Sequence, residues 1–373
     1  MRLQNKLTYV IASVAVSISV IAVSVSIYLT VQSMKAETLK NFERDLTAKR
    51  ILVKTSIEDY FVQINNQLVV MANDVSVIEA SENFSKSFDQ RKINTNNKKS
   101  LETYYSTQFK ATFDAQNEAP IKEMGLFSQL DEKALSMQIA FIGDNEHPLG
   151  EKDALNSLND NSKYDKLHSR YHSTFRSFLQ KFGYYDIFIV EPKEGRVVYS
   201  VFKELDFATR LKNGPYKNSG ISEAFNKALS LKNGETYLTD FGAYTPSYNN
   251  PASFISTPIY KNGKIVSVLI FQMPIDSINS VMTQKENWKE AGFGDSGETY
   301  LVGQDKKLRN ESRFFVDDPE GYFKTLEQVG IKEHTLIKQK GSSISLQPVD
   351  TSGSNKALNG EVGFEVFNDY RDI

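Results

Sequence analysis

The segment 183–202, GYYDIFIVEPKEGRVVYSVF, decides the fold class of this chain. Its two arms, 184–190 and 196–202, are rich in β-branched and aromatic residues, which favour strands. Between the arms, PKEG at 192–195 has the composition of a turn. The segment therefore predicts an antiparallel hairpin.

The sequence after this hairpin continues the same sheet. A short helix is predicted at 222–231, and strands are predicted at 235–241, 253–260 and 264–272. Asn-Gly at 262–263 joins the last two strands, and both residues tolerate the positive φ angles of a type I′ turn. The order of elements predicts an α+β fold, in which a PAS-like antiparallel sheet has its helices segregated to one side.

A second PAS-like unit is expected to follow. Pro274 ends the first sheet, and a linker helix at about 275–290 leads to Gly297, where a similar pattern restarts. The expected elements are strands at 298–302, 307–309, 343–346 and 362–368, a turn at 304–305 and a helix at 319–329. This second sheet lacks its closing hairpin and would leave an open edge, so we expect the chain to be a fragment of a longer protein.

Helices precede the hairpin. The chain contains no Gly or Pro before Pro120, which indicates long uninterrupted helices. We expect one helix at 101–113 after a polar link at 86–99, and another at 162–182. The latter opens with the capping-box pattern SKYD and closes at Gly183, where a left-handed cap would lie.

Residues 7–31 form an uncharged run of 25 residues. At about 1.5 Å per residue this run can cross the ~30 Å hydrocarbon core of a membrane once. Arg2 and Lys6 precede it, which favours a cytoplasmic N-terminus. The run is too long for a cleavable signal peptide. We therefore expect a signal anchor in the bacterial inner membrane, with Lys35 onward in the periplasm.

An apolar stripe with three- and four-residue spacing follows the anchor from Leu39 to Ile78, and it predicts a long stalk helix. The stripe is equally typical of an ordinary packing helix and of a dimer interface. Small residues spaced four apart in the anchor also favour a homodimer. These pairs are Ser13 with Ser17, Ala15 with Ser19, and Ala22 with Ser26. The expected segments are the anchor (1–32), the stalk and helical region (33–183), the first sheet (184–274), the linker (275–296) and the second unit (297–373).

Composition excludes several classes of function. Lys plus Arg total 44 against 46 Asp plus Glu, so the chain has no basic excess for nucleic acid. The absence of cysteine excludes disulfides, thiolate metal sites and cysteine nucleophiles. The sequence contains no nucleophile elbow and no phosphate loop. We therefore expect a non-catalytic segment that needs no cofactor.

Two motifs match patterns of nucleotide and metal sites, but we interpret both as ordinary structural features. GFGDSG at 292–297 matches G-x-G-x-x-G, but it follows a helix and opens a strand, so we interpret it as a turn between domains. His168 and His172 stand four residues apart with Asp165 one turn earlier, a spacing that could hold a metal. A solvated helix face is the favoured interpretation, because no other His lies nearby in the sequence.

Four segments resemble the double Cache (dCache) sensor domains of bacterial transmembrane receptors, most closely those of methyl-accepting chemotaxis proteins. These segments are PLGEKD at 148–153, FGYYDIF at 182–188, VYSVFKE at 198–204 and GETYLVG at 297–303. The resemblance implies a small-molecule site in the membrane-distal unit. It also implies a second membrane helix, a HAMP linker and a signalling domain beyond Ile373. Sensor histidine kinases and membrane-bound nucleotide cyclases share this module, so both remain alternative outputs.

The resemblance places a ligand in the first sheet, and the residues indicate where. Aromatic residues there alternate with aliphatic ones, and acidic residues stand at strand ends, so we expect the site on one sheet face, closed by the loop 206–216. The candidate residues are Tyr185, Tyr199, Asp206, Tyr216, Tyr237, Asp240 and Phe254. The alternative is that the aromatic residues only fill the core.

The candidate charges are acidic, which favours a cationic or neutral polar ligand. Amino-acid-sensing members of the family carry an Arg followed closely by Trp, whereas the single Trp of this chain, Trp288, lies outside the expected site. The leading hypothesis is therefore the input module of a chemoreceptor. A more distant alternative is an anchored structural or adhesion protein without a ligand.

Overall fold

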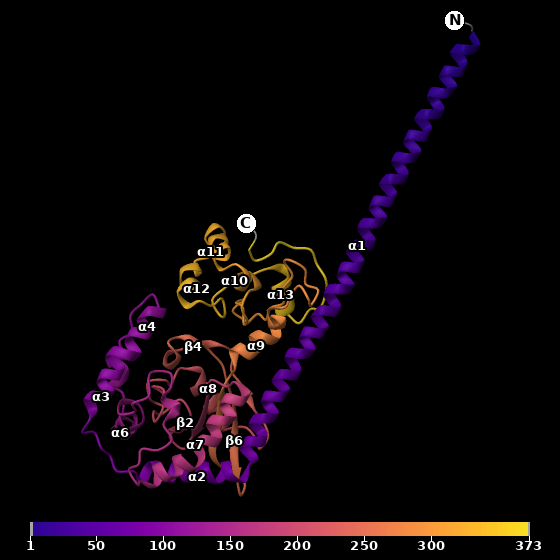
Figure 1. Cartoon of the computed structure of the whole chain (residues 1–373). Helices are drawn as coiled ribbons and strands as arrows, with labels where there is room; N and C mark the ends of the chain where they lie inside the picture. The colour runs from indigo at the N-terminus through magenta and orange to yellow at the C-terminus, as the bar shows by residue number, and fades with distance from the viewer. Residues whose placement is uncertain (1–2, 372–373) are drawn as a thin grey trace. The chain divides into compact units, whose positions relative to one another are not determined.

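The computed structural model describes residues 3–371. One compact unit holds the chain up to Thr55 together with Gly363–Glu365, and the other holds Ser56–Val362 and the residues from Val366 onward. The chain begins with helix α1 (Leu3–Asn73), drawn in indigo in Figure 1. Within the described residues, α1 is the one helix long and apolar enough to cross a membrane.

The stripe on α1 changes character along the helix. Leu39, Phe42 and Leu46 in the first unit are 50%, 59% and 41% exposed, so the chain itself leaves this part uncovered. In the second unit the stripe is buried, including Ile64 and Leu68, and it serves there as an ordinary packing face. The stalk helix is also shorter than predicted. Asp74 interrupts it, because its side chain accepts the backbone N–H groups of Ser76 and Val77 and caps a new helix, α2 (Val75–Gln90).

The main sheet has five antiparallel strands in the order β2-β1-β7-β6-β3. They are β1 (Asp186–Val190), β2 (Val197–Ser200), β3 (Tyr237–Leu238), β6 (Phe254–Lys261) and β7 (Lys264–Gln272). Asn262 and Gly263 turn between β6 and β7 with φ of 49° and 74°, as the hairpin prediction requires. A second, two-stranded sheet pairs β4 (Gly242–Tyr244) with β5 (Asn250–Ala252) around a short 3₁₀ turn, η4 (Thr245–Ser247). The α+β class is confirmed.

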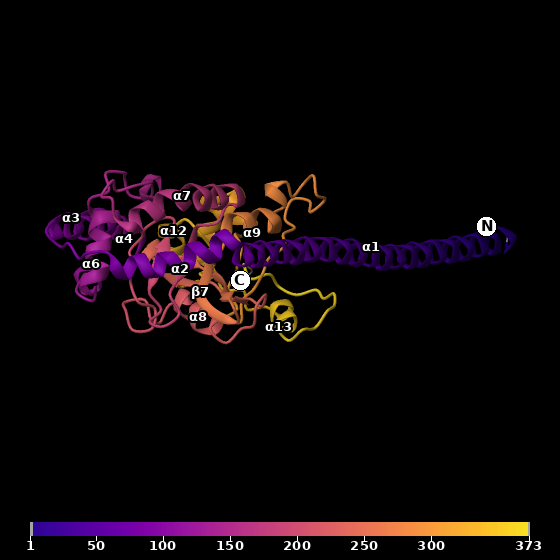
Figure 2. The same ribbon diagram turned by 90° about the horizontal axis from the view of Figure 1, so that it is seen from below.

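Helices cover both faces of the main sheet, so the expectation of helices on one side is wrong. Helix α8 (Gly220–Ala228) packs on the face that carries Phe188 and Val190. Helices α2 and α7 (Lys163–Phe182) pack on the other face, and Figure 2 shows α7 and α8 on opposite sides of β7. Every residue of β1 is buried, and a strand buried on both faces needs cover on both.

The helical region before the sheet follows the sequence closely. The helix predicted at 101–113 is one continuous element made of α3 (Lys98–Thr103), a π-helical stretch η1 (Tyr104–Phe109) and α4 (Lys110–Gln116). The polar link is narrower than predicted and covers residues 91–97, because α2 continues to Gln90. Shorter elements then lead to α7. These are α5 (Glu123–Phe127), α6 (Glu132–Gln138), the π-helical η2 (Ile139–Gly143) and the 3₁₀ turn η3 (Lys152–Ala154).

Helix α7 has the two predicted ends, with one difference. The Ser162 side chain accepts the backbone N–H of Asp165 at 3.0 Å, and Gly183 closes the helix with φ of 76°. The Asp165 carboxylate does not return the bond to Ser162. It accepts the backbone N–H of Leu158 at 2.6 Å and the Ser157 hydroxyl at 2.9 Å. The start of α7 is therefore capped on one side and tied to the preceding loop on the other.

The C-terminal region, residues 297–371, consists of short helices joined by turns and irregular segments, and the strands predicted at 298–302, 307–309, 343–346 and 362–368 are wrong. Within the described residues this region has only isolated bridges, Val302 with Leu308 and Lys307 with Pro348. Side chains satisfy backbone groups there, as when Asn310 accepts the N–H of Leu301. Residues 362–368 have too little to bury, since Val362 and Val366 are each 79% exposed.

The helix predicted at 319–329 is confirmed as α11 (Pro319–Gln328). The linker helix is shorter than predicted, because α9 (Ile275–Met282) gives way to the turn η5 (Gln284–Glu286). GFGDSG at 292–297 is a turn, as predicted, with Gly292 and Gly294 at positive φ. The remaining helices are α10 (Arg313–Asp317), α12 (His334–Lys340) and α13 (Ser352–Leu358).

Candidate ligand-binding site

The predicted site residues do not share one face of the main sheet. Tyr199 pairs with Ile189 on β1, whereas Phe254 lies level with Asp186 across β7. Ile189 and Asp186 are three residues apart, so these positions alternate to opposite faces. Tyr199 accordingly packs on rings of α2 and α7, while Phe254 belongs to the core beneath α8. The prediction of a single aromatic face is wrong.

Three of the predicted residues are engaged elsewhere. The Tyr185 hydroxyl donates to Asp276 at 3.1 Å, and the Tyr237 hydroxyl donates to Glu223 at 2.6 Å. Asp240 accepts two bonds from Arg309, at 2.7 and 2.8 Å. None of these interactions involves another predicted residue.

Of the remaining four, Tyr199 packs under α2 and α7, and Asp206, Tyr216 and Phe254 come together around a tyrosine that was not predicted. The Tyr244 hydroxyl donates to the Asp206 carboxylate. The Tyr244 ring lies 4.9 Å from that of Phe254 and 6.3 Å from that of Tyr216, measured between centroids. Further tyrosines and carboxylates interact electrostatically with this group. We call the set the acidic tyrosine cluster: Asp186, Glu204, Asp206, Tyr104, Tyr105, Tyr216, Tyr244 and Tyr248.

Secondary structure holds the acidic members in place. Asp186 opens β1, and one of its carboxylate oxygens accepts the backbone N–H groups of Val201 and Phe202 at 2.8 and 3.2 Å. Glu204 and Asp206 lie in the turn that follows β2. The Gln138 amide fastens that turn from α6, because it donates to the carbonyls of Leu205 and Phe207 at 2.8 and 2.7 Å.

The tyrosines come from elements distant in the sequence. Tyr104 and Tyr105 lie on η1, and the Tyr105 hydroxyl donates to Gln138 at 2.8 Å. Tyr244 ends β4, and Tyr248 follows η4 in a left-handed conformation with φ of 58°. The cluster is thus formed by the helical region, the edge of the main sheet and the β4–β5 hairpin.

Three buried polar atoms of the cluster have no hydrogen-bond partner among the described residues. They are Oδ2 of Asp186, Oδ1 of Asp206 and the Tyr216 hydroxyl. Asp186 is 2% exposed, Asp206 is 0% exposed and Tyr216 is 4% exposed. Leaving such an atom unpaired costs about 1–3 kcal/mol, and more for a charged group. The arrangement therefore favours a polar or charged partner supplied from outside the chain.

Burial dominates the electrostatics of the three carboxyl groups. It raises the pKa of Asp206 to about 6, against the opposing hydrogen bond from Tyr244. Burial and the neighbouring Asp206 raise the pKa of Asp186, and the same two causes raise that of Glu204. Burial also lowers the pKa of Lys203, which lies beside Asp186. A positive ligand charge would relieve the repulsion among these acidic groups.

His168 and His172 do not form the solvated face that we expected. Both are buried, and their rings stack with centroids 4.3 Å apart. His172 shares hydrogen bonds with the Tyr199 hydroxyl at 2.8 Å and the Asp153 carbonyl at 2.7 Å. Burial lowers the pKa of His172 to about 3. Within residues 3–371, no group of three or more His, Asp or Glu side chains is placed to hold a metal.

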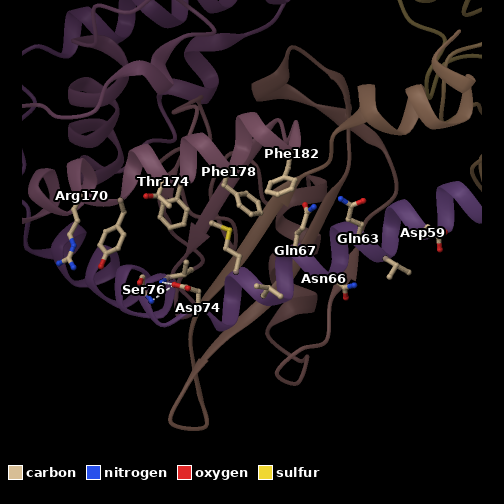
Figure 3. A pocket seen from close by; sticks show the side chains of 16 residues that line it. Asp59, Gln63, Asn66, Gln67, Asp74, Ser76, Arg170, Thr174, Phe178 and Phe182 are labelled. Carbon is tan, nitrogen blue, oxygen red and sulfur yellow. Dashed lines mark hydrogen bonds between the residues drawn. The ribbon is translucent and has the colours of Figure 1, made fainter. Parts of the chain in front are cut away.

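A separate apolar groove of about 880 Å³ runs between α7 and the α1–α2 junction. Figure 3 shows Phe178 and Phe182 of α7 across the groove from Gln63 and Gln67 of α1. At its floor, Met71 and Phe175 are buried. This groove could not be predicted from the sequence, because its lining comes from two helices about 100 residues apart in the chain.

Comparisons with known proteins find similarity only among solved structures. No protein-family model matches the chain, and no curated protein matches it. The chain is similar to the sensor domain of the V. cholerae histidine kinase DctB, with 13% sequence identity and a TM-score of 0.25. The match covers 48% of this chain and 58% of that one. The chain thus spans less than two thirds of the length of that sensor domain.

Proposed function

We propose that this chain is the extracytoplasmic, ligand-sensing input module of a bacterial transmembrane receptor. The observation that carries the proposal is the acidic tyrosine cluster, a largely buried set of carboxylates and rings in which Asp186, Asp206 and Tyr216 each have an unpartnered polar atom. Helix α1 supports it, because it combines a membrane-length apolar stretch with a segment that packs against the sheet region. The module itself is non-catalytic in this proposal, since the cluster suits binding.

The proposed receptor works as a two-state device in the inner membrane. Ligand binding would favour one arrangement of the sheet region, and α1 would transmit the difference to its cytoplasmic end. A homodimer is part of this proposal, because the uncovered stripe of Leu39, Phe42 and Leu46 can pack against a second copy. On the sequence resemblance, the output is chemotaxis signalling. The alternative output is a histidine kinase or a nucleotide cyclase, which would use the same input module.

The proposed ligand is a small organic cation, with a neutral polar molecule as the second choice. Three carboxyl groups compensate a positive charge, and tyrosine rings attract cations through their faces. The Lys203 ammonium lies over the Tyr199 ring at 4.5 Å, and it lowers the pKa of Asp186 but is not among the groups that shift the pKa of Asp206. Its charge therefore does not neutralise the Asp206 end of the cluster.

A thermal-shift measurement on the full chain in detergent tests the proposal. Tetramethylammonium chloride should raise the melting temperature, whereas sodium chloride at equal ionic strength should not. Asp206→Asn should remove the shift, and the exposed Asp89→Asn should retain it. Stabilisation by sodium acetate instead, or an equal tetramethylammonium shift in Asp206→Asn, would exclude a cation at this cluster.

A further inference from the structure

The β4–β5 hairpin connects the acidic tyrosine cluster to the C-terminal region. On the cluster side, Tyr244 donates to Asp206, and the Tyr248 ring stacks on Phe109 at 5.3 Å. Ser247, in the turn of the hairpin, accepts the Gln272 amide at 3.2 Å and lies 3.5 Å from the Glu204 carboxylate. The hairpin is therefore one wall of the candidate site.

Arg309 of the C-terminal region holds the chain just before β4. Its guanidinium donates two bonds to the Asp240 carboxylate, at 2.7 and 2.8 Å, in the paired geometry that suits arginine. Asp305 fixes the same guanidinium at 2.8 Å, and the Lys307 carbonyl accepts from it at 3.1 Å. The Arg309 side chain is only 7% exposed. A Cβ atom at Gly303 would overlap it, so the local backbone closely surrounds the guanidinium.

Lys340 of the C-terminal region holds the other side of the hairpin. Its ammonium group donates to the Tyr248 carbonyl at 2.7 Å. The Asn117 amide of the helical region donates to the same carbonyl at 3.0 Å. Tyr248 and Asn249 both have φ of 58°, a left-handed conformation that Asn tolerates but that is unfavourable for Tyr and requires support from neighbours.

We propose that Arg309 and Lys340 are positioning residues for the candidate ligand site, because they fix both sides of the hairpin that carries Tyr244 and Tyr248. This inference rests on the proposed function for its biological meaning. In this proposal, contacts from both the sheet region and the C-terminal region hold the β4–β5 hairpin, which forms one wall of the site. A ligand that moves Tyr244 therefore displaces Asp240, four residues earlier, and with it Arg309.

Burial of the Arg309 guanidinium gives its contact more weight than a surface contact has. Ion pairs between exposed side chains contribute about 0–1 kcal/mol. The Arg309 guanidinium is buried and uses several of its N–H groups, so removal of its partner would leave a buried charge incompletely paired. By contrast Lys306, three residues earlier, pairs with Asp350 in an exposed position at 2.9 Å and does not contact β4. Lys306 is the matched control.

Hydrogen exchange of the full chain in detergent provides the first test. Arg309→Ala should accelerate amide exchange in residues 242–252 by about tenfold or more, the change expected when a local contact of about 1.4 kcal/mol is lost. Lys306→Ala should leave that segment unchanged. Arg309→Lys keeps the charge but not the paired geometry, so it should give an intermediate rate. Equal exchange in Arg309→Ala and Lys306→Ala would overturn the proposal.

The pH midpoint of Asp206 titration provides a second test. If Arg309 only stabilised the C-terminal region, its removal would leave this midpoint unchanged. Asp186, Glu204, Tyr216 and Tyr244 face this carboxyl group. A loosened hairpin admits water, so the Asp206 midpoint should fall in Arg309→Ala and recover partly in Arg309→Lys. The midpoint is obtained by measuring melting temperature against pH for wild type, Arg309→Ala and Arg309→Lys, each with and without Asp206→Asn. The pH at which the difference within each pair changes is the Asp206 midpoint. An unchanged midpoint in Arg309→Ala would also overturn the proposal.

These measurements need no ligand and remain decisive in two cases. If Arg309→Ala also accelerates exchange in β6 and β7, the whole sheet is loosened, and Asp240→Asn is measured in its place. Asp240→Asn retains one acceptor for Arg309 but loses the charge and the second acceptor, so it should accelerate exchange in residues 242–252 and leave β6 and β7 unchanged. If exchange responds as expected but tetramethylammonium does not bind, the proposed ligand class fails while the positioning role stands.

Discussion

Asp206→Asn should stabilise the protein at neutral pH, although it removes a charge from a hydrogen-bonded site. The carboxyl group is 0% exposed and accepts the Tyr244 hydroxyl, a bond that an asparagine oxygen can also accept. Burial raises its pKa from 3.8 to about 6. The folded state therefore holds the Asp206 proton more tightly than the unfolded state does.

The sign of the pH dependence follows from this difference. Stability rises with pH only where the unfolded state binds more protons, and here the folded state binds more. The Asp206 contribution is fully present below about pH 4 and is lost as pH rises through about 6. A shift of about two units corresponds to about 3 kcal/mol, or a melting-temperature change of roughly 5 °C in a unit of this size.

Melting followed by circular dichroism at about pH 5 and about pH 7.5 brackets the transition in the full chain. Asp206→Asn should melt higher than wild type at the upper pH, and the difference should shrink at the lower pH. Asp89→Asn, whose side chain is 74% exposed, is the control and should follow wild type at both. The reasoning is refuted if Asp206→Asn melts no higher than wild type at the upper pH, or if the difference does not change with pH.

Three further predictions concern the membrane topology, the dimer and the core. An alkaline phosphatase fusion after Tyr60 should be active; an active cytoplasmic reporter at that point would reverse the topology. Cysteine at Phe42 should cross-link in membranes more readily than cysteine at Lys40, and equal yields would exclude the dimer stripe. Leu68→Ala should lower the free energy of unfolding by about 2–5 kcal/mol, because Leu68 is fully buried. Val70→Ala, at a site 71% exposed, should change it by less than about 0.5 kcal/mol, and similar losses in both variants in denaturant titrations would contradict the packing described.

Local signals in the sequence predicted local structure well. The turn at 262–263, the ends of α7 and the helix α11 each depend on a few adjacent residues, and all three agree with the structure. The second sheet did not follow. Its expected strand at 362–368 is largely exposed and has no buried face on which to pair, and residues 343–346 form a turn although Ser343 and Ile344 are buried. β-propensity measures how well side chains pack on a pleated surface, and it predicts little where no such surface exists.

The candidate site was only partly predictable for a related reason. Asp206 and Tyr216 lie in one short loop, and sequence composition identified them. Tyr104 and Tyr105 reach the same place from η1, about 100 residues earlier, and no local pattern connects them with that loop. Asp186 did carry a signal, because a carboxylate that opens an apolar strand must either reach solvent or find buried partners.

Asp240 was predicted to line the ligand site, and its actual partner, Arg309, could not be predicted from the sequence. The position of Asp240 at a strand end predicted a charge that faces a ligand cleft, whereas the structure pairs it with Arg309. Strand-end position predicts exposure to a partner but not the partner, because Arg309 follows 69 residues later on a different region. Asp240 lies just before the hairpin, four residues from Tyr244, so in the proposal above it still acts on the position of Tyr244. Asp240, predicted to bind the ligand, instead pairs with Arg309 and holds the chain before β4 against the C-terminal region.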